Sequence, residues 1–230
     1  MRPTPDALML FAAGFGTRMG ALTATRPKPL VKVAGRPLID HARDLVAGAG
    51  VARVVANTHY LSVQIAAHLD GTDVLISDES ACILETGGGL RKALPLLGPG
   101  PVFTLNTDAV WSGPNVLRAL RAAWDGGRMG ALLALVPPDR ALGHRGAGDF
   151  CLGPDGRITR GQGYVYSGAQ IVDPDGLETI PDTVFSLNRH WDRLIAEGRA
   201  FGIVHQGSWC DVGRPESIAL AEAMLGGSDG

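Results

Sequence analysis

Short apolar runs alternate with amphipathic helical patterns along the chain, and this alternation limits the fold more than any other sequence feature. The 32 glycines and 15 prolines cut the 230 residues into short pieces at the expected ends of these segments. Residues 7–12 are apolar throughout, as a strand buried on both faces of a sheet requires. Strands that alternate with helices predict an α/β fold with a parallel sheet.

The pattern changes after Pro137 and Pro138, so we divide residues 1–225 into two parts of one domain, 1–136 and 137–225. In the first part we expect strands at residues 7–12, 53–57, 73–76, 101–106 and 130–136, and helices at 37–47, 61–69, 89–97 and 114–124. In the second part we expect a hairpin at 150–159, strands at 164–172 and 201–205, and helices at 187–197 and 215–225. This second part is expected to be smaller and antiparallel. Residues 226–230 are expected to fray.

Charge and composition exclude several classes of function. Lysine and arginine number 21 against 23 acidic residues, a net charge of −2, so no general positive field attracts nucleic acid or an anionic membrane. The longest apolar stretches fall far short of the ~20 residues of a membrane helix. Three cysteines without a CxxC pair argue against a disulfide framework or a structural zinc site. We therefore expect a soluble, cytoplasmic protein that binds anions only locally.

A glycine-rich turn at residues 14–20 follows the first expected strand, where α/β sheets bind ligands. Glycines there let backbone N–H groups approach phosphate oxygens. Met19 stands where a dinucleotide-binding turn has its third glycine, and no Gly-Lys-Ser/Thr of a P-loop occurs. Arg18, Arg26 and Lys28 add three cations, with Lys28 held between two prolines. A phosphate site and a solvated basic loop are both compatible with this turn taken alone.

Residues 12–19 (AAGFGTRM) and 26–30 (RPKPL) together resemble the opening motif of the sugar-1-phosphate nucleotidyltransferases. The resemblance extends over nearly the whole chain. It implies a single Rossmann-like, three-layer α/β domain with a mixed, mostly parallel central sheet, a nucleotide-binding half at 1–136 and a sugar-binding half at 137–225. It further implies that Arg18 clamps the leaving pyrophosphate and that Lys28 bridges the reacting phosphates. The nucleotide-binding residues it implies are Ala12, Ala13, Gly14, Gly16, Thr17, Thr86 and Gly87.

Two aspartates carry the metal-binding part of this resemblance. Asp108, in Asn106-Thr107-Asp108, follows an expected strand and resembles the aspartate of the family's Asn-Gly-Asp. Asp211, in Trp209-Cys210-Asp211-Val212-Gly213, resembles the family's closing Trp-x-Asp-Val-Gly. Mg²⁺ is usually held by one or two carboxylates together with phosphate oxygens and water. The resemblance thus implies Mg²⁺ on Asp108 and Asp211, which only the fold can bring together. An aspartate that caps a turn is the alternative for Asp108.

The sugar-binding residues are implied by residues 146–150 (GAGDF) and 166–168 (YSG). They are Asn106, Gly148, Asp149 and Ser167, with Arg145 as a candidate cation for a sugar that carries a carboxylate. A hairpin and a strand with glycines for close packing is the alternative. Residues 161–163 (GQG) lack the glutamate with which many relatives hold sugar hydroxyls.

These features predict an Mg²⁺-dependent transferase that joins a nucleoside triphosphate to a sugar 1-phosphate. The ETGGG form at residues 85–89, the GDF piece at 148–150 and the Trp-x-Asp-Val-Gly ending together resemble a bacterial branch of the family. This resemblance implies UTP and N-acetylmuramate 1-phosphate, with GTP and mannose 1-phosphate as the alternative pair. A nucleotide-sugar binding or regulatory module without turnover is a second hypothesis. A nicotinamide dehydrogenase is a third, disfavoured by Met19 and by Asn57 in place of an acid.

Overall fold

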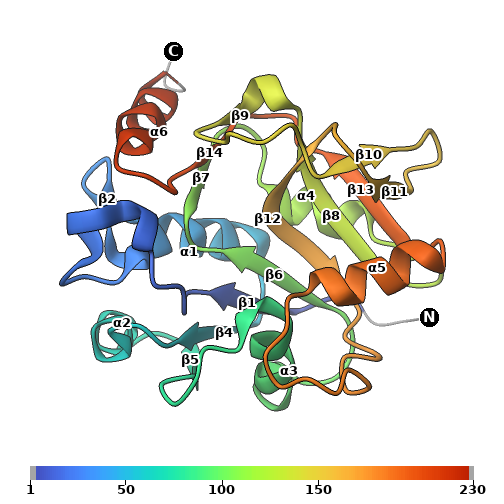
Figure 1. The fold of residues 1–230 in the computed structure, drawn as a ribbon, viewed down its shortest axis with the longest axis horizontal. Helices are drawn as coiled ribbons and strands as arrows, with labels where there is room; N and C mark the ends of the chain where they lie inside the picture. Colours follow the sequence, from blue (N-terminus) through green and yellow to red (C-terminus); the bar gives the residue numbers. More distant parts are fainter. Residues whose placement is uncertain (1–3, 228–230) are drawn as a thin grey trace.

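Seven strands form the central sheet of the computed structural model, which describes residues 4–227. Their spatial order is β13-β8-β12-β6-β1-β4-β5. Their bounds are Ala7–Phe11 (β1), Arg53–Thr58 (β4), Val74–Asp78 (β5), Val102–Asn106 (β6), Ala131–Val136 (β8), Val165–Val172 (β12) and Ala200–Val204 (β13). Strand β12 is antiparallel to β6 and β8, and the other neighbours pair in parallel. The expected mixed, mostly parallel sheet is confirmed (Figure 1).

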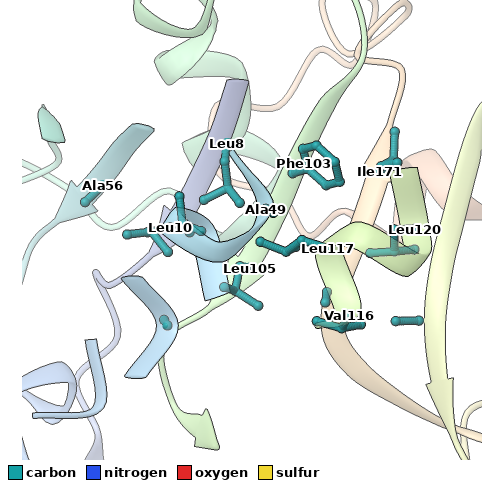
Figure 2. Close-up of a cluster of buried hydrophobic side chains, with 14 of the residues drawn as sticks. Leu8, Leu10, Ala49, Ala56, Phe103, Leu105, Val116, Leu117, Leu120 and Ile171 are labelled. Carbon is teal, nitrogen blue, oxygen red and sulfur yellow. The ribbon is translucent and has the colours of Figure 1, made fainter. Parts of the chain in front are cut away.

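Helices cover both faces of this sheet and complete three layers. One face carries α1 (Leu38–Ala49), α2 (Ser62–Leu69) and α4 (Val116–Ala123), and the other carries α3 (Glu85–Leu97) and α5 (Asn188–Ala196). Strand β1 supplies both cores, because successive side chains of a strand point to opposite faces. Leu8 and Leu10 join the first core and Met9 joins the second. Figure 2 shows the first core, where Leu8 and Leu10 lie near Phe103 and Leu105 of β6.

Helix α3 corrects one sequence prediction. It begins at Glu85, not after the three glycines, so Gly87, Gly88 and Gly89 lie inside the helix. A Cβ at Gly87 would stand 2.9 Å from the carbonyl oxygen of Phe185, and one at Gly89 would stand 2.7 Å from a carboxylate oxygen of Glu79. The glycines therefore allow the helix to pack closely against its neighbours. This packing outweighs their low helix propensity.

Helix α4 also begins later than predicted. Pro114 was expected in its first turn, but the helix starts after Asn115. The Asn115 Oδ1 accepts hydrogen bonds from the backbone N–H groups of Leu117 and Arg118, at 3.0 and 3.2 Å. Asparagine is a favoured N-cap because it satisfies donors that have no partner within the helix. The cap, rather than the proline, sets the start of α4.

The second half is less separate than the sequence indicates. The expected hairpin forms from β10 (Phe150–Leu152) and β11 (Ile158–Arg160), which pair antiparallel. Strands β12 and β13, however, complete the central sheet. A small sheet in the order β7-β14-β9 joins the two halves, with bounds Ala109–Trp111 (β7), Ala141–Leu142 (β9) and Trp209–Asp211 (β14). Sequence patterns did not predict β7, β9 or β14, because strands of two or three residues carry no periodicity.

The remaining elements are short, apart from the closing helix. Strands β2 (Lys32–Val33) and β3 (Arg36–Pro37) form a hairpin, and η1 (Thr17–Thr23), η2 (Lys28–Leu30) and η3 (Pro138–Arg140) are 3₁₀ turns. Helix α6 (Glu216–Gly226) packs near β14 (Figure 1). Residue 226, expected to fray, is still helical, and residues 228–230 of that expected tail lie outside the described residues. No helix in residues 4–227 has the length and apolarity to cross a membrane.

Candidate active site

The glycine-rich turn leaves β1 and leads into η1. Gly16 has a φ of +65°, and a Cβ there would meet the Lys28 side chain at 2.8 Å. The turn is closed on its inner side by the Met19 N–H, which donates to the carbonyl of Gly16 over 2.9 Å. Among the described residues, nothing accepts a hydrogen bond from the backbone N–H groups of Ala13 and Gly14. These two donors are available to an anion, as a phosphate site requires.

Lys28 and Asp108 form a partly buried ion pair. The Lys28 Nζ donates to Asp108 Oδ2 over 2.8 Å, although the two residues are 80 positions apart. Lys28 is 7% exposed, and its backbone is fixed in the 3₁₀ turn η2, with an extended Pro27 before it. Asp108 follows β6, where its carboxylate is one-third exposed. The structure thus brings these two residues of the predicted site together, with the amine largely withdrawn from solvent.

Asp211 lies beside Asp108 because their segments pair. Strand β14 is antiparallel to β7 with Asp211 opposite Ala109, and the Val212 N–H donates to the carbonyl of Asp108 over 2.9 Å. Burial and the nearby Asp108 charge raise the pKa of the Asp211 carboxyl, and Lys28 and Arg18 oppose that rise. Two carboxylates therefore share a site that holds more negative charge than Lys28 alone neutralises.

This donor set suits a hard divalent cation. Mg²⁺ prefers carboxylate oxygens and is commonly held by two of them, with phosphate and water completing the shell. Within residues 4–227, no three or more His, Cys, Asp and Glu side chains lie together in a way that could hold a metal ion. Asp108 and Asp211 would hold the ion, and substrate oxygens and water would complete its coordination. The raised pKa of Asp211 fits this role, because a cation would favour its charged form.

A cavity of about 210 Å³ opens next to this pair, at the carboxyl ends of β1, β4 and β6. The residues predicted from the sequence that line it are Ala12, Ala13, Gly14, Lys28, Thr86, Asn106 and Asp108. The other lining residues are Phe11, Pro29, Asn57, Glu79, Ile83, Glu85 and Thr107. Gly16, Thr17, Arg18, Gly87 and Asp211 lie outside this lining. Asn57 ends an expected strand, so the rule that ligands bind at carboxyl ends of strands gave a signal for it.

The start of α3 forms one wall of the cavity. Glu85, its first residue, has a φ of +59°, which is unusual for a residue other than glycine and occurs often at functional sites. The Thr86 Oγ1 accepts a hydrogen bond from the Leu187 N–H over 3.0 Å. The N–H of Gly87 donates to the carbonyl of Phe185 over 2.9 Å, so that amide already has a protein partner.

The four residues predicted to bind the sugar do not all line the cavity. Asn106 lines the cavity. The Asp149 Oδ2 accepts from the Tyr166 N–H over 2.8 Å, and the Ser167 hydroxyl donates to the carbonyl of Ala134 over 2.6 Å, so both side chains have partners within the fold. A Cβ at Gly148 would clash with the backbone of Gly163. These contacts are the close packing that the sequence left open as the alternative.

The Arg145 side chain forms an ion pair within the protein. Its Nη2 lies 2.9 Å from Glu216 Oε1, and both side chains are more than half exposed. Exposed pairs of this kind contribute little to stability and break readily. A contact between Arg145 and a sugar carboxylate therefore stays a prediction.

A three-layer α/β fold whose glycine turn, buried lysine and paired aspartates meet at one sheet edge defines an enzyme of nucleotidyl transfer. The chain belongs to the family of the MobA-like NTP transferase domain, whose model matches residues 8–146. Its expected membership among the sugar-1-phosphate nucleotidyltransferases is confirmed by relatives that span nearly its whole length. It is 41% identical to the N-acetylmuramate alpha-1-phosphate uridylyltransferase of Caulobacter vibrioides, over 98% of this chain and 99% of the relative.

Other similarities agree with this assignment. The protein of the same name from Neisseria meningitidis is 35% identical over 95% of this chain and 97% of its own. A mannose-1-phosphate guanylyltransferase catalytic subunit from Danio rerio is more distant, 26% identical over 94% of this chain and 63% of that protein. The crystal structure of HddC from Yersinia pseudotuberculosis has a TM-score of 0.77 at 20% identity and covers 96% of this chain and 99% of its own. This last likeness shows the fold alone.

Proposed function

We propose that the chain transfers the uridylyl group of UTP to the phosphate of N-acetylmuramate 1-phosphate and releases pyrophosphate. The observation that carries the reaction type is the partly buried ion pair of Lys28 and Asp108 at the edge of the cavity, with Asp211 beside it. The choice of base and sugar follows the relative that is 41% identical over nearly the full length. N-acetylmuramate is a building block of peptidoglycan, so the product fits peptidoglycan recycling in the cytoplasm.

The reaction needs positioning and positive charge more than it needs a base. An oxygen of the sugar phosphate forms a bond to the α-phosphorus, and the bond from that phosphorus to the bridging oxygen of the β-phosphate breaks. A phosphate monoester has its second pKa near ~6, so at neutral pH the attacking group is already mostly a dianion. The obstacle is repulsion between two anions, which fixed cationic groups reduce.

Four groups at the site, three of the chain's own and one bound cation, meet this need. Ala13 and Gly14 offer backbone N–H donors, which have no acceptor within residues 4–227, to phosphate oxygens. Lys28 brings a positive charge that is shielded from water. Electrostatic interactions are stronger in such a shielded position than in water. Bound Mg²⁺ on Asp108 and Asp211 would supply further positive charge to the reacting phosphates. Arg18, exposed on η1, adds a cation for the leaving pyrophosphate.

A matrix of substrates tests the proposal. Each of five nucleoside triphosphates is combined with N-acetylmuramate 1-phosphate, mannose 1-phosphate and N-acetylglucosamine 1-phosphate, and pyrophosphate release is followed with Mg²⁺ present or chelated. UTP with N-acetylmuramate 1-phosphate should give the highest kcat/KM, and chelation should abolish it. A highest value for GTP with mannose 1-phosphate would replace the substrate pair. No pyrophosphate from any pair would favour the binding module without turnover.

A further inference from the structure

Glu79 is a buried carboxylate on the cavity wall that the reaction described above does not use. It is 1% exposed, and it lines the cavity together with Asn57, which is 3% exposed. Within the described part of the chain, no lysine, arginine or histidine side chain forms an ion pair with Glu79. A buried charge without a counterion depends on its hydrogen bonds. The donors to Glu79 therefore indicate what it does.

A chain of three hydrogen bonds runs through Glu79 from one wall of the cavity to another. The N–H of Ala12, at the end of β1, donates to Asn57 Oδ1 over 2.8 Å. The Asn57 Nδ2 donates to Glu79 Oε1 over 2.7 Å. The N–H of Leu84, just before α3, donates to Glu79 Oε2 over 3.0 Å. The network thus joins the beginning of the glycine turn to the start of α3.

The direction of these hydrogen bonds requires a carboxylate at one of the two positions, 57 or 79. Both ends of the network are backbone N–H groups, which only donate. Asn57 accepts from one end and must donate onward, so Glu79 has to accept on both of its oxygens. A glutamine accepts on only one oxygen, and its amide would meet a second donor. One residue of the connecting pair must therefore be a carboxylate.

The neighbouring helix makes room for this network. A Cβ at Gly89 would stand 2.7 Å from Glu79 Oε1 and 3.0 Å from Asn57 Nδ2. The last glycine of the ETGGG segment therefore lets α3 approach the network closely. The carboxylate also lies beside the N-terminus of α3, through its hydrogen bond from the Leu84 N–H.

We propose that Glu79 and Asn57 are positioning residues for the nucleotide. They set the separation between the glycine turn and the start of α3, the two walls that line the cavity on either side. This inference rests on the proposed function only in that the cavity binds a nucleoside triphosphate. The affinity for the sugar 1-phosphate does not depend on this network.

The test begins with Glu79→Gln, in which one buried donor loses its acceptor. We expect KM for UTP, and the Kd for UTP measured by calorimetry without sugar, to rise about tenfold or more. The KM for the sugar 1-phosphate should stay within about twofold. An unchanged affinity for UTP in folded Glu79→Gln would overturn the proposal, even if its Tm falls, because the network would then serve stability alone. Exposed Glu197→Gln, another carboxylate-to-amide change, is the matched control.

The double variant Asn57→Asp/Glu79→Gln is the decisive arm. Here the introduced aspartate accepts from Ala12 and from the glutamine amide, whose oxygen accepts from Leu84, so every hydrogen bond has a donor and an acceptor again. The affinity for UTP should return to within about threefold of the wild type. Asn57→Asp alone places two carboxylates together and should weaken binding. A folded double variant that binds UTP more than about tenfold more weakly than the wild type would contradict the proposal, and this holds even if Glu79→Gln alone does not fold.

Failure of the proposed function is distinguishable from failure of this inference. If the wild type binds UTP but turns over a different sugar, only the substrate assignment fails. If another nucleotide replaces UTP in the substrate matrix, the same five proteins are compared with that nucleotide. In either case the affinities of the two variants decide the role of Glu79.

Discussion

At the scale of a single residue, the charged carboxylate of Asp211 lowers the stability of the folded chain. Burial and the charge of Asp108 raise the pKa of its carboxyl above the usual value of 3.8. The unfolded chain therefore loses this proton at a lower pH than the folded chain, and the free energy of unfolding falls as the pH rises through that interval. Above that interval the folded chain carries this buried charge at a cost in stability. A carboxylate kept under such conditions is typical of a functional site.

Asp211→Asn tests this trade-off between stability and function. The amide removes the buried charge, so in the presence of a chelator at pH 7.5 the Tm of the variant should exceed that of the wild type. Pyrophosphate release should be lost, because a neutral amide holds Mg²⁺ poorly. Asp70→Asn, at an exposed position beyond α2, should leave both properties unchanged. A Tm below that of the wild type, or normal turnover, would contradict this account.

Lys28 is the second residue whose role can be isolated. Lys28→Ala removes the shielded positive charge 2.8 Å from Asp108, and kcat should fall roughly 10²- to 10³-fold, as for other preorganised electrostatic contacts. Steady-state rates of pyrophosphate release measure this. Lys32→Ala changes an exposed lysine of β2 and should keep wild-type kcat. If the two variants had equal rates, Lys28 would have no part in catalysis.

At the scale of the element, α3 shows why local patterns misplace a helix start. Three successive glycines predict a loop, because each lowers helix propensity by up to about 1 kcal/mol. The structure instead buries all three, and the reason lies in residues far along the chain, such as Phe185 and Thr183. Sequence periodicity describes one element at a time. A prediction from periodicity therefore does not take into account another segment that packs closely against the helix.

A pair of glycine substitutions measures this close approach. Gly88→Ala would bring a Cβ against the carbonyl oxygen of Thr183, a backbone atom that cannot move aside, so we expect a loss of about 1–3 kcal/mol in the free energy of unfolding. At Gly226, in α6, a Cβ meets nothing within 4 Å. Gly226→Ala should therefore keep or raise the stability, by up to about 1 kcal/mol. Urea denaturation of both variants decides, and equal stabilities would contradict the packing argument.

At the scale of the whole molecule, the sequence predicted the layers but not the junction that assembles the site. Continuous apolar runs located the strands of the sheet, because neighbouring residues such as Leu8 and Met9 are both buried when helices cover both faces. The meeting of Asp108 and Asp211 depends on β7 and β14, three residues each, whose pairing is decided by the surrounding fold. Family motifs indicated the two aspartates, whereas Glu79 belongs to no motif that we recognised. Its role became visible only from its partners.

A fall in pH should lower the free energy of unfolding of the whole molecule through His190. This residue is 1% exposed, and its Nε2 donates to the carbonyl of Asp173 over 2.9 Å. Burial, and then the charge of Arg193, lower the pKa of His190 to about 4. The unfolded chain takes up this proton near pH 6.5, so stability is full above that value and falls as the pH drops toward 4.

Comparison with His190→Gln isolates this effect. Between pH 7 and pH 5 the wild type should lose on the order of 2 kcal/mol more unfolding free energy than the variant. Urea titrations at the two pH values measure the difference. His205, whose pKa is also lowered by burial, is present in both proteins and cancels. Parallel losses in the two proteins would show that His190 does not titrate in this way.

The central claim is that Asp108 and Asp211 act together as one cation site beside Lys28. Mn²⁺ binding, followed by paramagnetic resonance with a non-hydrolysable UTP analogue present, tests it independently of turnover. We predict that the wild type binds Mn²⁺ with the analogue and that Asp108→Asn and Asp211→Asn each weaken this binding at least about tenfold. Wild-type affinity for Mn²⁺ in either single variant would contradict the claim.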